Sequence, residues 1–147
     1  MLQILYNKRD KHTWCNKHQI IKNKLQLPKF QMSKQYDLEE RTFQFAKNVS
    51  LYIKKFSIAI SNIEYGKQVV RSSGSVGANY IEANEALSKK DFIMRIKICR
   101  KEAKESTYWL RLIVETNDTK YTEDGNKLSN EATELKKIFS AILEKSK

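Results

Sequence analysis

Hydrophobic residues recur every three or four positions through most of residues 36–147, which is the spacing of an amphipathic α-helix. This periodicity predicts four helices, each with one apolar side to bury. Their expected limits are about 37–56, 61–87, 88–115 and 123–145. Long amphipathic helices joined by short connections favour an all-α fold, an antiparallel up-down four-helix bundle.

Three of the expected helix starts carry a side chain suited to capping. Asp37, Ser61 and Ser88 each stand three positions before an acidic residue, the spacing of a capping box. Each predicted helix has a stripe of residues that we expect to be buried. The stripes are, in the first helix, Leu38, Phe45, Val49, Tyr52 and Phe56; in the second, Ile63, Val70, Gly77, Tyr80 or Ile81, Asn84 and Leu87; in the third, Phe92, Ile93, Ile96, Cys99, Ala103, Leu110, Ile113 and Val114; and in the fourth, Leu128, Ala132, Leu135, Ile138 or Phe139, and Ile142.

The second predicted helix is rich in glycine and serine near its middle. A glycine inside a helix costs about 1 kcal/mol relative to alanine, so Gly74 and Gly77 need an explanation. Ser73, Gly74, Gly77 and Ala78 lie along one side of the helix and predict a small-residue face for close helix packing; a hinge is the alternative. A phosphate-binding loop fits poorly, because it needs a preceding strand and a following lysine.

Residues 1–35 differ from the rest of the chain. They hold eight Lys or Arg and one acid, and Pro28 interrupts their one plausible helical stretch. We interpret them as a basic, poorly structured N-terminal extension before a bundle domain at 36–147. Three interpretations remain open: a flexible tail that contacts a polyanion, a short helix packed on the bundle, or the result of an upstream start codon, with Met32 as the native start.

The charge distribution favours a polyanionic partner. The formal net charge is +11, and residues 36–147 contribute twenty bases and sixteen acids. A basic surplus attracts RNA, DNA or anionic lipid. In the third predicted helix, the pairs Lys97–Lys101 and Arg100–Lys104 repel at i,i+4 spacing, which an anionic ligand or an acidic partner would explain; the alternative is a solvated face balanced by neighbouring helices. The candidate nucleic-acid-binding residues are Lys89, Lys90, Arg95, Lys97, Arg100, Lys101, Lys104 and Arg111.

The sequence gives little support for a catalytic site or a metal-binding site. Residues 36–147 contain no histidine, which excludes Glu-x-x-His metal pairs and Ser/His or Cys/His catalysis within the fold. The pairs Glu82–Glu85 and Glu102–Glu105 are interpreted as helix surface charges, and Cys99 as a small buried hydrophobe. In the extension His12, Cys15 and His18 are spaced three apart, but a metal site needs at least a fourth ligand. We expect no enzymatic activity, no cofactor and no metal.

Two further expectations concern location and aromatic residues. No stretch approaches the roughly 18–20 apolar residues that cross a bilayer, and the N-terminus has too short an apolar run for a signal peptide, so we expect no membrane association and a cytoplasmic location. Tyr108 and Trp109 are suited to stacking on single-stranded bases, but core or subunit packing is the favoured interpretation.

Several sequences carry a resemblance to a known family: residues 71–79 (RSSGSVGAN), residues 82–86 (EANEA), the Lys/Arg-rich helix and residues 105–112. On these, about three quarters of the chain resembles the four-helix-bundle proteins encoded in intervening sequences of bacterial 23S ribosomal RNA genes, a family that includes the accessory variability proteins of diversity-generating retroelements. The resemblance implies a homo-oligomer, a pentameric ring in similar members. Members that resemble the accessory variability protein bind nucleic acid and a reverse transcriptase, whereas the members encoded in ribosomal RNA intervening sequences have no defined role.

We therefore expect a bundle that binds RNA or DNA through its third helix. Two alternatives stay open: a module that docks an acidic protein such as a reverse transcriptase, and a structural bundle without a nucleic-acid role.

Overall fold

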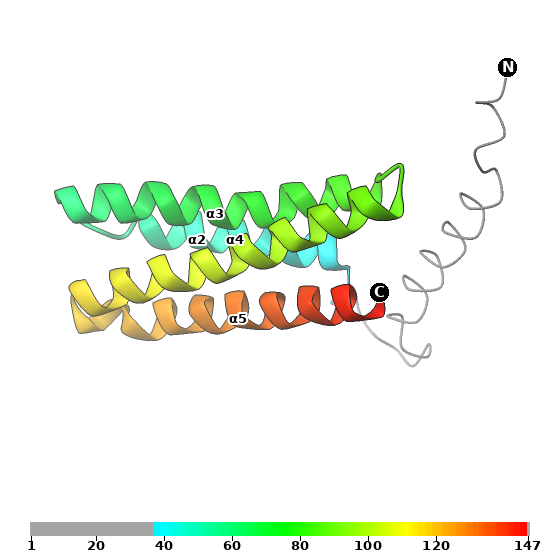
Figure 1. Ribbon diagram of the computed structural model, residues 1–147. Coiled ribbons are helices and arrows are strands. Elements are labelled where there is room, and N and C mark those ends of the chain that lie inside the picture. The colour runs from blue at the N-terminus through cyan, green and yellow to red at the C-terminus, as the bar shows by residue number, and fades with distance from the viewer. Residues whose placement is uncertain (1–36, 147) are drawn as a thin grey trace, which may run out of the picture.

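The computed structural model describes residues 37–146 as four long α-helices without a strand. They are α2 (Leu38–Ile53), α3 (Ile60–Asn84), α4 (Lys89–Thr116) and α5 (Thr122–Lys145), with a short 3-10 helix, η1 (Thr119–Tyr121), before α5. The helices run alongside one another (Figure 1) and confirm the expected antiparallel four-helix bundle. The interpretations of the N-terminal extension, including Met32 and the His12–Cys15–His18 spacing, lie outside the described residues.

The order of the helices around the bundle leaves α2 and α4 at opposite corners. α3 packs against both α2 and α4, and α5 also packs against both. Segments 54–59 and 85–88 are short connections, so each helix reverses the direction of the one before it. The outer side of α4 consequently faces away from α2.

Two of the three predicted caps are confirmed. The Asp37 carboxylate accepts a hydrogen bond from the backbone N–H of Glu39 (3.0 Å), and the Ser88 hydroxyl accepts one from the N–H of Asp91 (3.1 Å). The prediction for Ser61 is wrong, because α3 begins one residue earlier and its N-cap, Ala59, makes no side-chain cap bond.

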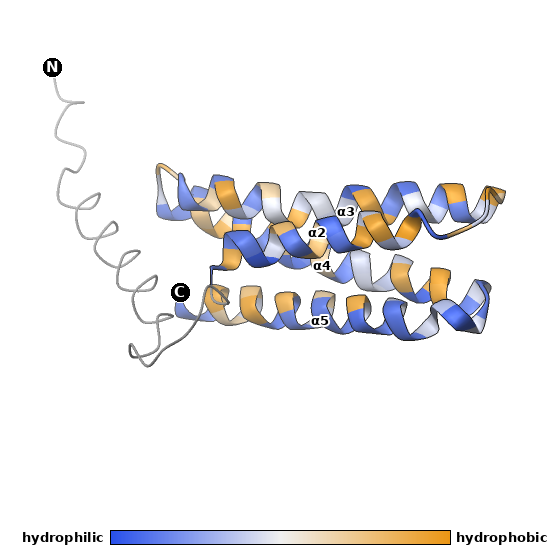
Figure 2. Ribbon diagram, turned by 180° about the vertical axis from the view of Figure 1, so that it is seen from behind, coloured by the Kyte–Doolittle hydropathy of each residue, from blue (hydrophilic) through white to orange (hydrophobic). Residues whose placement is uncertain are grey.

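The buried sides of α2, α4 and α5 match the predicted stripes. Hydrophobic and hydrophilic residues alternate along each helix (Figure 2), as an amphipathic pattern requires. Large side chains from these three helices fill the centre of the bundle: Phe45, Val49, Ile96, Leu110, Ile113, Leu135 and Phe139. Their burial supplies the main stabilisation of the fold, at roughly 25 cal/mol for each Å² of apolar surface removed from water.

The stripe predicted for α3 is wrong for its large aliphatic residues, whereas Tyr80, one of the two residues predicted at its position, packs against the core. Ile63, Val70 and Leu87 are 41%, 40% and 87% exposed. The buried side of α3 consists mainly of small residues: Gly66, Val69, Ser72, Ser73, Val76 and Ala83. The buried hydroxyls are satisfied within the helix, since those of Ser72 and Ser73 donate to carbonyls three residues earlier. The outer side of this helix therefore also carries large apolar side chains, in addition to the buried Val69 and Val76.

The small-residue face is correct for only two of its four residues. Ser73 is buried, and a side-chain carbon added to Gly77 would lie 3.3 Å from the hydroxyl oxygen of Thr42 on α2. By contrast, a carbon added to Gly74 would meet nothing within 4 Å, and Ala78 is exposed. The packed side of α3 runs through Ser73 and Gly77, whereas Gly74 and Ala78 face outward.

Candidate nucleic-acid interface

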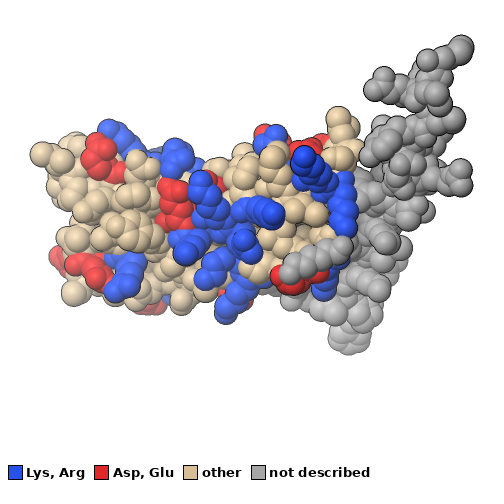
Figure 3. Space-filling model, viewed as in Figure 1, with Lys and Arg blue, Asp and Glu red and all other residues tan. Residues whose placement is uncertain are grey.

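The basic surplus of the bundle is concentrated at the start of α4. Residues 89–104 hold seven bases and two acids, whereas the rest of residues 36–147 holds thirteen bases and fourteen acids. Figure 3 shows Lys and Arg gathered over α4 in the middle of one face of the molecule. Because the remainder is close to neutral, this segment dominates the electrostatic field of the folded region.

Five exposed bases, which we call the basic face, form the core of this surface: Lys90, Lys97, Arg100, Lys101 and Lys104. Four of them make no ion pair with any acid in residues 37–146. The ammonium of Lys101 lies 3.9 Å from a carboxylate oxygen of Glu102, a distant contact. Positive charge on this face is therefore available to an external anion.

Two of the predicted bases serve within the fold instead. The guanidinium of Arg95 contacts Glu82 of α3 at 2.5 Å and Asp91 of α4 at 3.7 Å. Arg111 pairs with Glu115 at 2.7 Å. The remaining predicted base, Lys89, is exposed at the first position of α4. The structure thus separates the predicted set into an available basic face and bases held by neighbouring acids.

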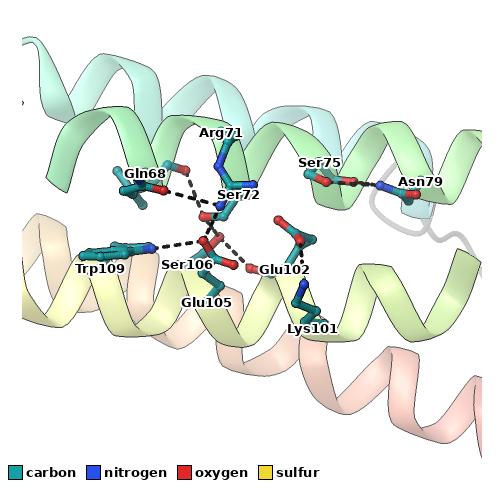
Figure 4. Close-up of polar contacts among 11 residues, drawn as sticks. Gln68, Arg71, Ser72, Ser75, Asn79, Lys101, Glu102, Glu105, Ser106 and Trp109 are labelled. Atoms are coloured by element: carbon teal, nitrogen blue, oxygen red, sulfur yellow. Dashed lines mark hydrogen bonds and ion pairs between the residues drawn. The ribbon is translucent and has the colours of Figure 1, made fainter. Parts of the chain in front are cut away.

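Polar contacts between α3 and α4 fix the rotation of α4 (Figure 4). The hydroxyls of Ser72 and Ser106 share a buried hydrogen bond of 2.8 Å. One carboxylate oxygen of Glu105 accepts from the Arg71 guanidinium (2.5 Å) and from the Trp109 indole N–H (3.2 Å). The Ser72–Ser106 and Arg71–Glu105 bonds join the two helices and turn one side of α4 toward α3, which presents the basic face to the outside.

Glu102 occupies this same junction, and its interpretation as a surface charge is wrong. It is 5% exposed and points toward α3 (Figure 4). Its Oε2 atom is buried and accepts no hydrogen bond from residues 37–146. Glu105 is likewise held in the fold by its two donors. The signal available in the sequence was spacing, since Glu102 follows buried Cys99 by three residues and precedes buried Ser106 by four.

The two aromatic residues near the end of α4 have different surroundings. Trp109 is half-buried and stacks on Tyr65 of α3, with ring centroids 6.0 Å apart. Tyr108 is 58% exposed, so it is not part of the core of this chain. Packing against a second subunit, the other part of that expectation, stays a prediction. Its ring meets the edge of Trp109 at 5.0 Å and an interplanar angle of 74°.

The described residues offer little catalytic chemistry. The Cys99 thiol donates to the carbonyl of Val76 (3.4 Å), and burial raises its pKa to about 12, which keeps it protonated and unreactive. No group of three metal-binding side chains occurs within residues 37–146. Over the same residues, no helix combines the length and the apolar character that crossing a membrane requires.

Architecture and surface charge define an all-α bundle with one basic face, and comparison with known proteins places it in a family. A family model described as 23S rRNA-intervening sequence protein matches residues 34–141. The chain therefore belongs to this family, as the resemblance implied.

A solved structure supports the same relationship. The crystal structure of a protein of unknown function from the S23 ribosomal protein family of Bacteroides thetaiotaomicron VPI-5482 is 34% identical, with a TM-score of 0.58. The similarity covers 71% of this chain and 96% of that chain. No curated protein matches the chain.

Proposed function

We propose that this protein is a non-enzymatic, homo-oligomeric bundle that binds RNA or DNA in the cytoplasm through the basic face of α4. The observation that carries the proposal is that the basic surplus of the bundle lies in residues 89–104, where four exposed bases make no ion pair with any acid of residues 37–146. Lysine and arginine at such a face neutralise phosphates and release counterions. Binding is electrostatic and weakly dependent on sequence, because phosphate contacts carry no base information.

Self-association is supported by an apolar surface away from the basic face. Phe43 on α2 and Ile63, Val70 and Ile81 on α3 are 40–59% exposed. Since α2 and α4 occupy opposite corners, a second copy that covers these side chains leaves the outer side of α4 free. A ring, of five copies as the family resemblance suggests, repeats the basic face and multiplies its avidity for a long polyanion.

The test is charge reversal of the basic face. The variant Lys97→Glu, Arg100→Glu, Lys101→Glu, Lys104→Glu should lose most affinity for labelled RNA and DNA in fluorescence anisotropy. In the wild type, log K should fall steeply as log salt rises, by about 0.7–0.9 for each neutralised phosphate. Loss of four contacts should lower that slope by about 3 for each subunit that touches the strand.

A matched control distinguishes an effect of the basic face from an effect of the net charge of the protein. The control set is four exposed bases outside α4, and changing all four to Glu alters the charge equally: Lys47 on α2, Lys54 directly after α2, Lys67 on α3 and Lys145 on α5. This control should retain most of the wild-type affinity. If the α4 variant binds with wild-type affinity, the assignment of the binding site to the basic face is wrong. Equal losses in both variants would show that net charge, and not α4, governs binding.

Light scattering tests the oligomer. A monomer has a mass of 17.3 kDa, and the proposal requires a larger particle that gains mass with RNA at low salt and releases it at high salt. A monomer would remove the avidity argument. An oligomer that binds neither RNA nor DNA at low salt would contradict the proposed function and favour docking of an acidic protein.

A further inference from the structure

An exposed aromatic ring lies among the cations of α4. Tyr108 follows Lys101 by seven residues and Lys104 by four, so all three project from one side of the helix. The rise from Lys101 to Tyr108 is about 10 Å along the helix axis. With 58% of its surface exposed, Tyr108 contributes little to the core. An external ligand that meets these cations also meets the ring.

The neighbour that supports this ring is itself anchored. Trp109 stacks on Tyr65 and donates its indole N–H to Glu105, which is held by Arg71. Tyr108 meets Trp109 in an edge contact, which covers at most one face of the tyrosine ring. A ring restrained on one side loses little conformational freedom when a flat partner covers its other face.

From this geometry we propose that the nucleic acid bound at the basic face is single-stranded and that Tyr108 stacks on one of its bases. The inference rests on the proposed function and specifies its ligand. Sites for single strands combine cations that follow the backbone with aromatic rings on which bases stack. In a duplex the bases are already stacked and paired, so their faces are closed to such a ring. Lys97, Lys101 and Lys104 supply the phosphate contacts of the same strand.

The experiment compares four ligands of equal length with the full-length protein at one low salt concentration. They are a single-stranded RNA, a single-stranded DNA, a duplex of the DNA, and a DNA backbone with abasic sites throughout. The wild type should bind both single strands about tenfold more tightly than the abasic strand, within the range for one base–aromatic stack. The two single-stranded arms also show whether RNA or DNA is preferred.

Variants assign the effect to the ring. Tyr108→Ala should weaken single-strand binding about tenfold and leave abasic-strand binding unchanged, whereas Tyr108→Phe should bind as the wild type does. Met94→Ala is the matched control, because Met94 is an exposed side chain on the same side of α4 without a ring, and it should change little. Because Tyr108 is exposed, its variants should unfold at the wild-type temperature.

The outcomes distinguish this inference from the function on which it rests. Equal wild-type affinity for single, duplex and abasic strands overturns the stacking inference and leaves electrostatic binding intact. A single-strand preference that survives Tyr108→Ala also overturns the role of Tyr108. Failure to bind any of the four ligands overturns both proposals.

Discussion

Two helical glycines, Gly125 and Gly74, have opposite surroundings. Gly125, in the first turn of α5, lies against Tyr52 of α2 and Val114 of α4. A side-chain carbon there would lie 3.0 Å from Cζ of Tyr52 and closer still to its hydroxyl and to a methyl group of Val114. Tyr52 cannot move without loss, because its hydroxyl donates to the carbonyl of Tyr121 (3.1 Å). This contact accounts for a glycine where helix propensity alone disfavours one.

We predict that Gly125→Ala lowers the free energy of unfolding by about 1–3 kcal/mol, the usual range for overpacking. Helix propensity acts in the opposite direction by about 1 kcal/mol, so a loss would show that the contact dominates. Urea denaturation measures the change. The control is Gly74→Ala, which meets no atom within 4 Å and should raise the free energy of unfolding by about 0.5–1 kcal/mol. If both substitutions stabilise the protein, the close packing at Gly125 is refuted.

At the scale of elements, the junction of α3 and α4 contains two carboxylates with unequal support. Glu102 is buried with one oxygen unpaired, and Glu105 accepts two hydrogen bonds. A buried polar atom without a partner costs free energy, whereas a satisfied one contributes about 1 kcal/mol. The two residues, one turn apart on the same helix, should therefore respond to the same substitution with opposite signs.

We predict that Glu102→Met raises the free energy of unfolding by about 1 kcal/mol or more, because methionine removes the unpaired oxygen and fits an irregular space. Glu105→Met should lower it by about 1 kcal/mol, because Arg71 and Trp109 lose their shared acceptor. Thermal and urea unfolding at neutral pH measure both. Destabilisation by Glu102→Met would mean that its carboxylate has a favourable role in the junction.

These two helices also show where sequence patterns succeed and where they fail. In α4 the buried side carries large apolar residues such as Phe92, Ile96 and Leu110, so periodicity alone identified it. In α3 the buried side carries serine, glycine and alanine beside Val69 and Val76, and Ile63 and Val70 face outward. Side-chain size indicates burial only when a helix packs through large side chains, and α3 packs through small ones.

The candidate site was predictable to a similar extent. The density of bases in residues 89–104 is visible in the sequence, and it is enough to place the exposed bases on α4. Which bases remain available depends on contacts with other helices, as when Glu82 of α3 engages Arg95. The exposure of Tyr108 and the burial of Glu102 likewise depend on the rotation of α4 against α3, which periodicity could not fix to within one residue.

At the scale of the whole molecule, three acidic groups on three helices are held neutral by burial. Burial is the main cause that raises the pKa of Tyr52 on α2, of Tyr80 on α3 and of Cys99 on α4, each to about 12. Their ordinary values are 10.0 for the tyrosines and 9.0 for the thiol. In the unfolded chain these groups lose their protons near the ordinary values, whereas in the folded protein they keep them. Ionisation of any of these three groups therefore favours the unfolded state.

We predict that the free energy of unfolding falls as pH rises from 9 toward 12. Above pH 9 the unfolded state binds fewer protons than the folded state, so stability decreases with pH, by at most about 1.4 kcal/mol per pH unit for each group. Between pH 9 and 10 the thiol accounts for most of this difference, because the tyrosines begin to titrate later. The slope of the free energy of unfolding against pH is measured by urea denaturation at several pH values in this range. The protein used carries Cys15→Ser, so that Cys99 is its single cysteine. In the Cys99→Ala variant this slope should become smaller, even if the cavity left by the substitution lowers the free energy of unfolding itself. An unchanged slope in that variant would mean that the Cys99 thiol ionises equally in both states and is not protected by the core.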